Sequence, residues 1–283
     1  MSAKTVSSLW RCLRYDMVAG RRFMAVTCLG TSIITVSLFI YLYALAPSYG
    51  IDTSSFSFGD ALAIILAGSP HIEIRPGVIP SLPLGWLVLI GAVLSASVSY
   101  PASDLRRGGG ASILLGGSRK TWMASKMAWS AMTVFLACAV MGVVALAISI
   151  ALGFSLDLSL HEEAFRLTGV WMDYLTFVPE SILLFAAQAI LVTLAFVEVQ
   201  LVVGLFVHPL FAFGLITAYA VAGCYIEVPA FIGNGLMFAR WGLCIANGVP
   251  PEPIIVLAFA ALALACLSAF LLICRIDLLE RRV

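Results

Sequence analysis

Long runs without charged side chains alternate with short polar segments along this chain. The uncharged runs cover residues 23–51, 76–103, 127–156, 181–197, 199–226 and 253–274. A helix needs ~20 predominantly apolar residues to cross the ~30 Å hydrocarbon core of a bilayer. Five runs exceed that length, and the fourth does so once Glu180 and Glu198 are placed at its ends. The pattern therefore predicts six transmembrane helices.

The polar segments set the expected boundaries. We expect an interfacial helix over 1–22 and transmembrane helices over 23–46, 84–102, 127–152, 179–201, 205–226 and 253–274. Outer loops are expected over 47–83 and 153–178, and an outer re-entrant segment over 227–252. A cytoplasmic loop over 103–126 and a cytoplasmic tail over 275–283 complete the chain. Six spans use nearly the whole length, so the expected fold class is one all-α polytopic transmembrane domain over 1–283.

Basic residues predict the orientation of these helices. Thirteen of the 16 Lys and Arg residues fall on one side of the predicted topology. They are Lys4, Arg11, Arg14, Arg21, Arg22, Arg106, Arg107, Arg119, Lys120, Lys126, Arg275, Arg281 and Arg282, against Arg75, Arg166 and Arg240 on the other side. Cytoplasmic loops carry an excess of basic residues. Both termini are therefore expected in the cytoplasm, and the protein in the cell (plasma) membrane.

The amino-acid composition supports a membrane protein and indicates which classes of partner it binds. The 283 residues are 62% hydrophobic and 11% charged, with a mean hydropathy of +1.06, far from the ~25% charge of soluble domains. The basic inner face favours membrane lipids with anionic headgroups, or a cytoplasmic protein, as partners. No basic groove interleaved with aromatic residues is evident, so no nucleic-acid partner is predicted.

Three shorter segments have patterns of their own. Apolar residues at positions 6, 9, 10, 13 and 17 follow helical spacing, which favours an amphipathic helix in the cytoplasmic interface over a simple basic flank. The run ALAIILAG at 61–68 is too short to cross and is expected on or in the outer leaflet. The run HEEAFRLTGVWMDY at 161–174 suits a short surface helix.

The cysteines and histidines predict no metal site. The seven cysteines lie mostly within or at the ends of spans, where packing is their expected role. Only Cys224 and Cys244 could meet on the outer side as a disulfide, and the sequence leaves that pairing open. There is no Cys-x-x-Cys and no His/Cys cluster of metal-ligand spacing.

Glu198 is the most unusual single residue, because an ionisable group near the end of a span is costly and often functional. Gln200 and His208 are its expected neighbours across the turn between the fourth and fifth spans. A satisfied polar cluster is the favoured interpretation, and a proton relay is the alternative.

The sequence does not match the motifs for enzymatic chemistry that we compared with it. Lys120-Thr121 follows glycines, but a phosphate-binding G-x-x-x-x-G-K-[ST] loop would need glycine at Leu114 and Arg119. No acid, base and nucleophile converge elsewhere in the sequence. We therefore predict that the chain is not itself an enzyme and binds no cofactor.

The cytoplasmic loop contains GGGASILLGGSRKTWMASK at 108–126. Two glycine breaks flank one or two apolar turns, and Ser118 can cap a helix that runs into the third span. An apolar segment projecting from the cytoplasmic face is a protein docking surface or lies on lipid.

This loop carries a resemblance to a known family. A short helix after the second span, followed by Gly-Ser-Arg-Lys-x-Trp at 117–122, resembles the permease subunits of ABC-2 exporters, the second exporter class of ABC transporters. The N-terminal interfacial helix, six spans and long apolar segment between the last two spans are similar too. The long outer loop after the first span departs from compact members, which leaves the subfamily and substrate open.

The resemblance implies a permease that pairs with a second permease copy, identical or homologous, and with two copies of a separate ABC ATPase subunit. ATP and Mg would be bound by that partner subunit. The loop would be the coupling helix, with Ile113, Leu114 and Leu115 packed in the ATPase and Arg119, Lys120 and Lys126 near its acidic groups.

The same resemblance implies a route for a peptide, lipid-like or drug-like substrate. Ser95, Ser97, Ser99, Thr217 and Tyr219 would line a path along the second and fifth spans, although small residues there equally suit close helix packing. Phe231, Phe238 and Trp241 would form an outer gate. Export follows from family analogy alone. The alternative is a membrane-embedded binding or immunity protein that acts at the outer face without an ATPase.

Overall fold

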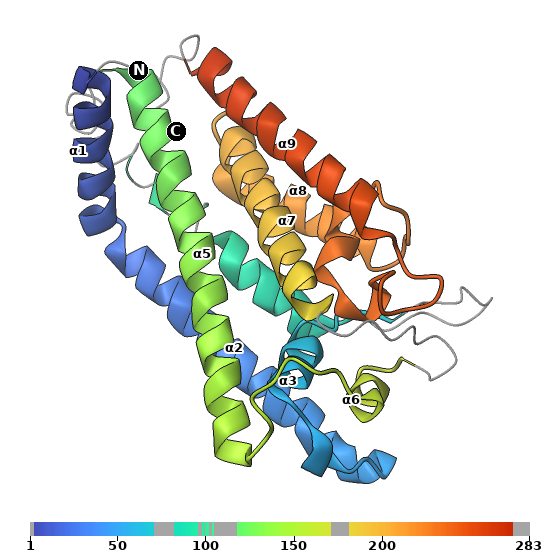
Figure 1. Cartoon of the computed structure of the whole chain (residues 1–283). Helices are drawn as coiled ribbons and strands as arrows, with labels where there is room; N and C mark the ends of the chain where they lie inside the picture. The colour runs from blue at the N-terminus through green and yellow to red at the C-terminus, as the bar shows by residue number, and fades with distance from the viewer. Residues whose placement is uncertain are drawn as a thin grey trace.

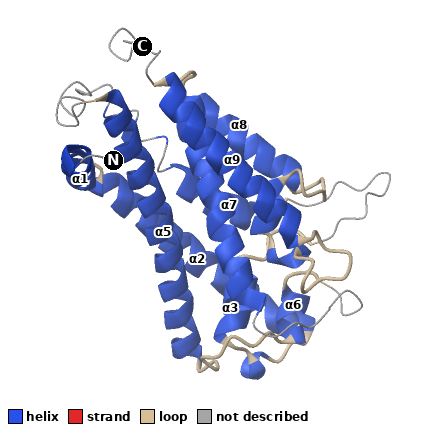
Figure 2. Ribbon diagram, turned by 45° about the horizontal axis from the view of Figure 1, so that its top comes forward, coloured by secondary structure: helices blue, strands red, loops and turns tan. Residues whose placement is uncertain are grey.

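The computed structural model describes residues 3–70, 82–95, 98, 100–101, 104, 118–170 and 181–273. Every regular element in these residues is a helix, which confirms the all-α fold class (Figures 1 and 2). The α-helices are α1 (Ala3–Ala19), α2 (Arg21–Leu45), α3 (Phe58–Ile65), the Leu84–Ser95 helix, α5 (Arg119–Leu152), α6 (Glu162–Leu167), α7 (Ser181–Gly204), α8 (Pro209–Gly223) and α9 (Pro251–Leu272). Short 3-10 turns are η1 (Ala46–Tyr49), η2 (Thr53–Ser55), η4 (Ile232–Leu236) and η5 (Phe238–Arg240).

Four helices in the described residues are long and apolar enough to cross a membrane. They cover Arg21–Tyr49, Arg119–Leu152, Ile182–Gly204 and Pro251–Leu272. The helices Leu84–Ser95 and Pro209–Gly223 are apolar but shorter. Four of the six expected spans therefore have the length of a spanning helix. The short α8 starts at Pro209, which has no N–H to donate, and ends at Gly223.

The helices form two groups that meet along α5 and α7. α1 and α2 pack along α5, while α8 and α9 pack along α7. α1, the start of α5 and the end of α9 lie at one end of the molecule, and α3, α6 and the turns after α8 lie toward the other (Figure 1). We call these the α1 end and the α3 end.

α5 begins earlier than the expected residue 127. The Ser118 hydroxyl accepts the Thr121 N–H at 3.1 Å, which confirms Ser118 as the helix cap. From Arg119 the helix runs unbroken to Leu152 and ends at Gly153, whose φ of +75° suits a C-terminal glycine. The expected loop over 103–126 is therefore helical from residue 119 onward.

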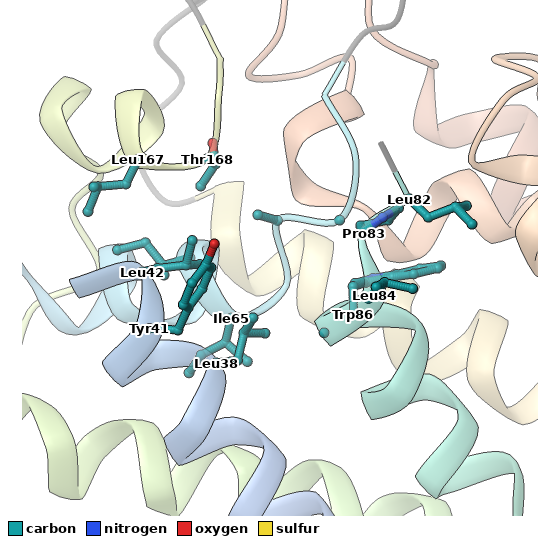
Figure 3. Close-up of a pocket in the computed structure, with 14 residues that line it drawn as sticks. Leu38, Tyr41, Leu42, Ile65, Leu82, Pro83, Leu84, Trp86, Leu167 and Thr168 are labelled. Carbon is teal, nitrogen blue, oxygen red and sulfur yellow. The ribbon is translucent and has the colours of Figure 1, made fainter. Parts of the chain in front are cut away.

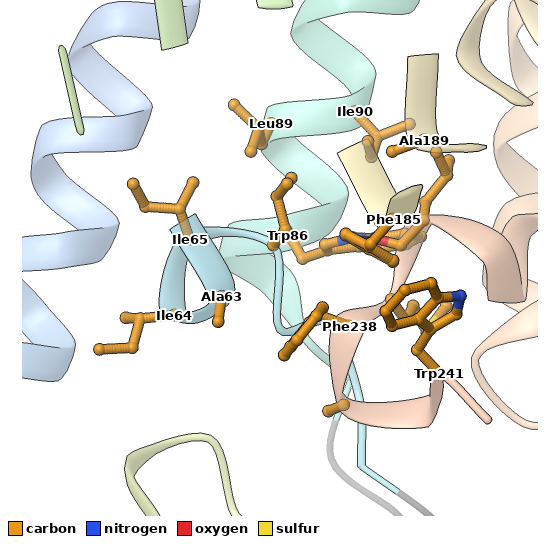
Figure 4. Close-up of a cluster of buried hydrophobic side chains, with 14 of the residues drawn as sticks. Ala63, Ile64, Ile65, Trp86, Leu89, Ile90, Phe185, Ala189, Phe238 and Trp241 are labelled. Atoms are coloured by element: carbon orange, nitrogen blue, oxygen red, sulfur yellow. Dashed lines mark hydrogen bonds between the residues drawn. The ribbon is translucent and has the colours of Figure 1, made fainter. Parts of the chain in front are cut away.

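α3 corrects the expectation for the apolar run at 61–68. Ala63, Ile64 and Ile65 are buried against other helices, so this segment packs inside the protein instead of lying in lipid (Figure 4). α3 is held between α2, α5 and α6. The sequence did not show this burial, because an apolar run suits lipid and protein interior equally.

The other two short segments are helical as expected. α6 lies within the run at 161–174 and buries Phe165. The apolar residues of α1 have two different environments. Leu13 and Met17 pack toward Trp129 of α5, whereas Val6 and Trp10 are exposed.

Candidate functional site

A buried charge cluster joins α1 to α5 at the α1 end. Lys126 is fully buried, and its Nζ lies 2.6 Å from Asp16 Oδ1 and 2.7 Å from Asp104 Oδ2. Asp16 comes from α1 and Lys126 from α5, and Asp104 follows the second apolar segment. One ammonium group thus bridges two carboxylates from separate parts of the chain. Such pairs persist in an interior only when further hydrogen bonds satisfy them.

Neighbouring side chains supply those hydrogen bonds. The Tyr100 hydroxyl donates to Asp16 Oδ1 at 2.8 Å, and the Ser125 hydroxyl donates to the other Asp16 oxygen. The Trp122 indole donates to Asp104 at 3.3 Å. The Lys126 ammonium also lies 4.5 Å from the centre of the Tyr100 ring, at cation–π distance. The cluster fixes the first turns of α5 against α1.

The charge cluster corrects the role expected for Lys126. We expected this side chain to contact a partner subunit, but the structure places it inside the protein with Asp16. Arg119 is half-buried and Lys120 is exposed at the first turn of α5. Ile113, Leu114 and Leu115 lie outside the described residues, as do Ser97 and Ser99.

Cys12 lies one turn before Asp16 and faces the same interface. Its side chain is buried, and burial raises the pKa of the thiol, with a further contribution from the Asp16 carboxylate. A thiol held in this form is a poor nucleophile, because the thiolate is the reactive species. Its reactivity therefore reports whether α1 stays docked on α5.

Glu198, Gln200 and His208 have separate partners. Glu198 Oε1 accepts the Ser130 hydroxyl of α5 at 2.6 Å. Gln200 donates from Nε2 to the Leu94 carbonyl at 2.9 Å. His208 caps α8, where its Nδ1 accepts the Leu210 N–H at 3.3 Å. The expected cluster is thus replaced by two contacts that tie α7 to neighbouring helices, through Glu198 and Gln200, and by a local cap of α8 at His208.

Three residues of the expected substrate path, Ser95, Thr217 and Tyr219, lie in the described part of the chain, and they do not share one surface role. The exposed Ser95 donates to the Ala92 carbonyl of its own helix at 2.7 Å, and Thr217 is half-buried. The Tyr219 hydroxyl donates to the Ala230 carbonyl and accepts the Ile232 N–H at 3.2 Å. Tyr219 therefore holds the segment after α8 in place instead of lining a free surface.

The three aromatic residues of the expected outer gate are packed. Phe231 stacks on Tyr219 with ring centres 5.2 Å apart. Phe238 and Trp241 are almost fully buried, and both contact Phe185 of α7, at 5.0 and 5.4 Å between ring centres (Figure 4). The segment 227–252 is therefore packed against α7 through Phe238 and Trp241.

Arg240 secures the same segment. Its guanidinium is buried and donates from Nη1 to the Gly223 carbonyl at 2.8 Å and from Nη2 to the Cys224 carbonyl at 2.6 Å, at the C-terminal end of α8. It also donates to the Asn234 side chain and to the Pro70 carbonyl. A cation at a helix C-terminus complements the partial negative charge there.

A pocket of about 440 Å³ opens at the α3 end (Figure 3). Its wall is largely apolar, with the hydroxyls of Tyr41 and Thr168 among its polar groups. The lining residues are Leu38, Tyr41, Leu42, Ile64, Ile65, Ala67, Gly68, Leu82, Pro83, Leu84, Gly85, Trp86, Leu167 and Thr168. A concave apolar surface with a few polar groups suits an amphipathic ligand. The sequence did not indicate it, because α2, α3 and the Leu84–Ser95 helix are far apart in the chain.

Asp60 and His161 form a second polar contact at this end. Asp60 is fully buried and accepts the N–H of Ser57 at 2.9 Å and the N–H of His161 at 2.7 Å. The His161 Nδ1 lies 2.7 Å from Asp60 Oδ2. Burial raises the pKa of Asp60, and this effect outweighs the hydrogen bonds, which lower it. The contact ties the loop before α6 to the start of α3.

The described residues offer no group of three or more His, Cys, Asp or Glu side chains placed to hold a metal. Cys224 and Cys244 are both buried with free thiols, so the disulfide that the sequence left open is not formed in this structure.

Comparison with known proteins adds no relative. No protein-family model, curated protein or solved structure matches this chain.

Proposed function

We propose that this protein is the permease subunit of an ATP-driven ABC-2-type exporter for an amphipathic substrate. The observation that carries the proposal is the continuous α5, which begins at Arg119, directly after its cap Ser118, and runs to Leu152. A movement imposed on the first turn of α5 would pass straight into a membrane-spanning helix, since the helix is continuous from Arg119 to Leu152.

The charge cluster supports the same proposal. Lys126 ties the beginning of α5 to α1 through Asp16, so a force at the loop would displace both helices as one body. Rigid-body displacement of packed helices is a common way in which binding energy opens a path. The pocket at the α3 end would then receive the substrate on its way out.

The proposed assembly has two permease copies and two ATPase subunits, with ATP and Mg held by the ATPase. Loop residues Ile113, Leu114 and Leu115 would enter the ATPase, with Arg119 and the exposed Lys120 at the edge of the contact. Lys126 would act inside the permease and not at the contact.

Co-purification from the native host tests this proposal. Tagged protein in mild detergent should retain a soluble ATPase with a Walker-type nucleotide site. Leu114→Asp and Lys120→Glu should each reduce its recovery, whereas Arg166→Glu, an exposed charge reversal in α6, should not. Absence of an ATPase across several mild detergents would remove the transporter proposal.

The pocket at the α3 end favours a second candidate, a binding or immunity protein that sequesters an amphipathic ligand. This function needs no ATPase. Ligand capture by the purified chain, without ATPase in the native complex, would support it over the exporter.

A further inference from the structure

A second cavity of about 150 Å³ lies deeper in the bundle, between α2, α3, the Leu84–Ser95 helix, α5 and α7. Its walls are almost entirely apolar, as shown by Leu89, Ile90 and Val93 on one side and Ala137 and Ala189 on others. Apolar cavities of about this size stay free of water and bind small apolar molecules. It shares no lining residue with the pocket at the α3 end.

The cavity opens sideways between α5 and α7. Its wall residues Met141, Gly142 and Ile190 on these helices are half-buried, whereas Leu89 and Val93 at its back are fully buried. A Cβ built on Gly142 would meet no atom within 4 Å, so this helix face borders open space. α5 and α7 are both long enough to span the membrane. A ligand would therefore enter from the hydrocarbon of the bilayer.

Thr31 places one polar group in this apolar wall. The residue is buried, lines the cavity, and its hydroxyl has no hydrogen-bond partner within the described structure. Thr193, which also lines the cavity, instead donates to the carbonyl four residues earlier at 2.7 Å, as Thr133 does in α5 at 2.9 Å. A buried hydroxyl without a partner is destabilising, because it has lost its hydrogen bond to water without gaining another. A ligand carrying an acceptor would recover that loss.

We propose that this cavity is a binding site for a small neutral molecule with a hydrocarbon body and one hydrogen-bond acceptor. The hydrocarbon body fills the apolar volume, and the Thr31 hydroxyl donates to the acceptor. A charged ligand is excluded because no ionised group among the described lining residues would compensate its charge. The site requires no ATP-hydrolysing partner, so its test is independent of the proposed function.

Photolabelling of the purified full-length protein tests the site. The probe is a medium-chain primary alcohol that carries a diazirine in its chain, and mass spectrometry locates the modified residues. We expect labelling on the wall segments around Cys138–Gly142 and Ala186–Ile190. Gly142→Leu should reduce it several-fold by filling the mouth. Gly214→Leu in α8 is the matched control, because a Cβ there also meets nothing within 4 Å. Labelling that is unaffected by Gly142→Leu would overturn the site.

The role of Thr31 is tested separately by competition. Thr31→Val preserves shape but removes the hydroxyl, and should weaken competition by the unlabelled alcohol roughly two- to tenfold. Competition by an alkane of equal length should be unchanged. Thr35→Val is the control, since the Thr35 hydroxyl is also buried without a partner but lies outside the cavity wall. Equal effects of the two substitutions would overturn the assignment of Thr31 as the donor.

Discussion

Lys126 of α5 and Asp16 of α1 form a buried ion pair, with Nζ and Oδ1 2.6 Å apart and both side chains shielded from solvent. The pair connects an N-terminal helix to a helix more than a hundred residues later. Asp104 shares the same ammonium group at 2.7 Å. The pair therefore contributes to the docking of α1 on α5, together with the packing of Leu13 and Met17 toward Trp129.

Removing that lysine should destabilise the protein strongly. In Lys126→Met, two buried carboxylates lose the cation that bridges them, and breaking a buried pair in this way costs ~3–5 kcal/mol. Denaturant unfolding in detergent measures the loss. Lys120→Met, an exposed lysine two turns earlier on the same helix, should change the free energy of unfolding by under about 0.5 kcal/mol. Similar values for both variants would contradict the buried-pair account.

Cys12 should report the docking of α1. Burial raises the pKa of its thiol, so alkylation by a maleimide at neutral pH should be slow and should keep accelerating above the pH at which an exposed cysteine levels off. Peptide mass spectrometry identifies the modified cysteine. In Lys126→Met we expect faster modification of Cys12, because α1 separates from α5. An unchanged rate in a folded variant would show that the pair does not hold α1.

The contribution of Asp60 to stability should depend on pH. Burial raises the pKa of this carboxyl above its unfolded value, so its contribution is fully present below the ordinary aspartate pKa and declines as the pH rises through the folded value. Asp60→Asn mimics the protonated form. Its stability relative to wild type should increase from acidic to neutral pH, as measured by thermal unfolding in detergent. If the stability of Asp60→Asn relative to wild type instead decreases from acidic to neutral pH, the hydrogen bonds to Asp60 outweigh its burial.

Arg240→Lys should loosen the segment after α8. Lysine lacks the planar guanidinium that donates simultaneously to Gly223, Cys224, Asn234 and Pro70, so several buried acceptors lose their partner. Leaving one buried acceptor without a hydrogen bond lowers the free energy of unfolding by ~1–3 kcal/mol. We expect a clearly lower unfolding temperature and faster proteolysis within 227–252. Arg166→Lys in α6 is the control, because its side chain is exposed. Equal behaviour of the two variants would argue against a structural role for Arg240.

The helices could be predicted from the sequence because their signals are local. Charge-free runs of membrane length predicted α2, α5, α7 and α9, and Ser118 was recognised as a residue that can cap a helix leading into α5. These signals need only neighbouring residues, through helical periodicity and capping. The transmembrane part of α5 was nevertheless expected only from residue 127, because the charge-free run begins after Lys126. Lys126 instead finds buried carboxylates, which the local pattern does not show.

By itself, the amino-acid sequence determined an all-helical membrane protein, since composition and uncharged run length decide whether a chain enters a bilayer. Only the tertiary structure decided which side chains meet. It paired Asp16 with Lys126, bound Tyr219 to the segment after α8, buried α3 between helices and left Thr31 facing a cavity. The physical reason is that polar groups in an apolar interior must find partners across long stretches of chain, and helix packing selects those partners.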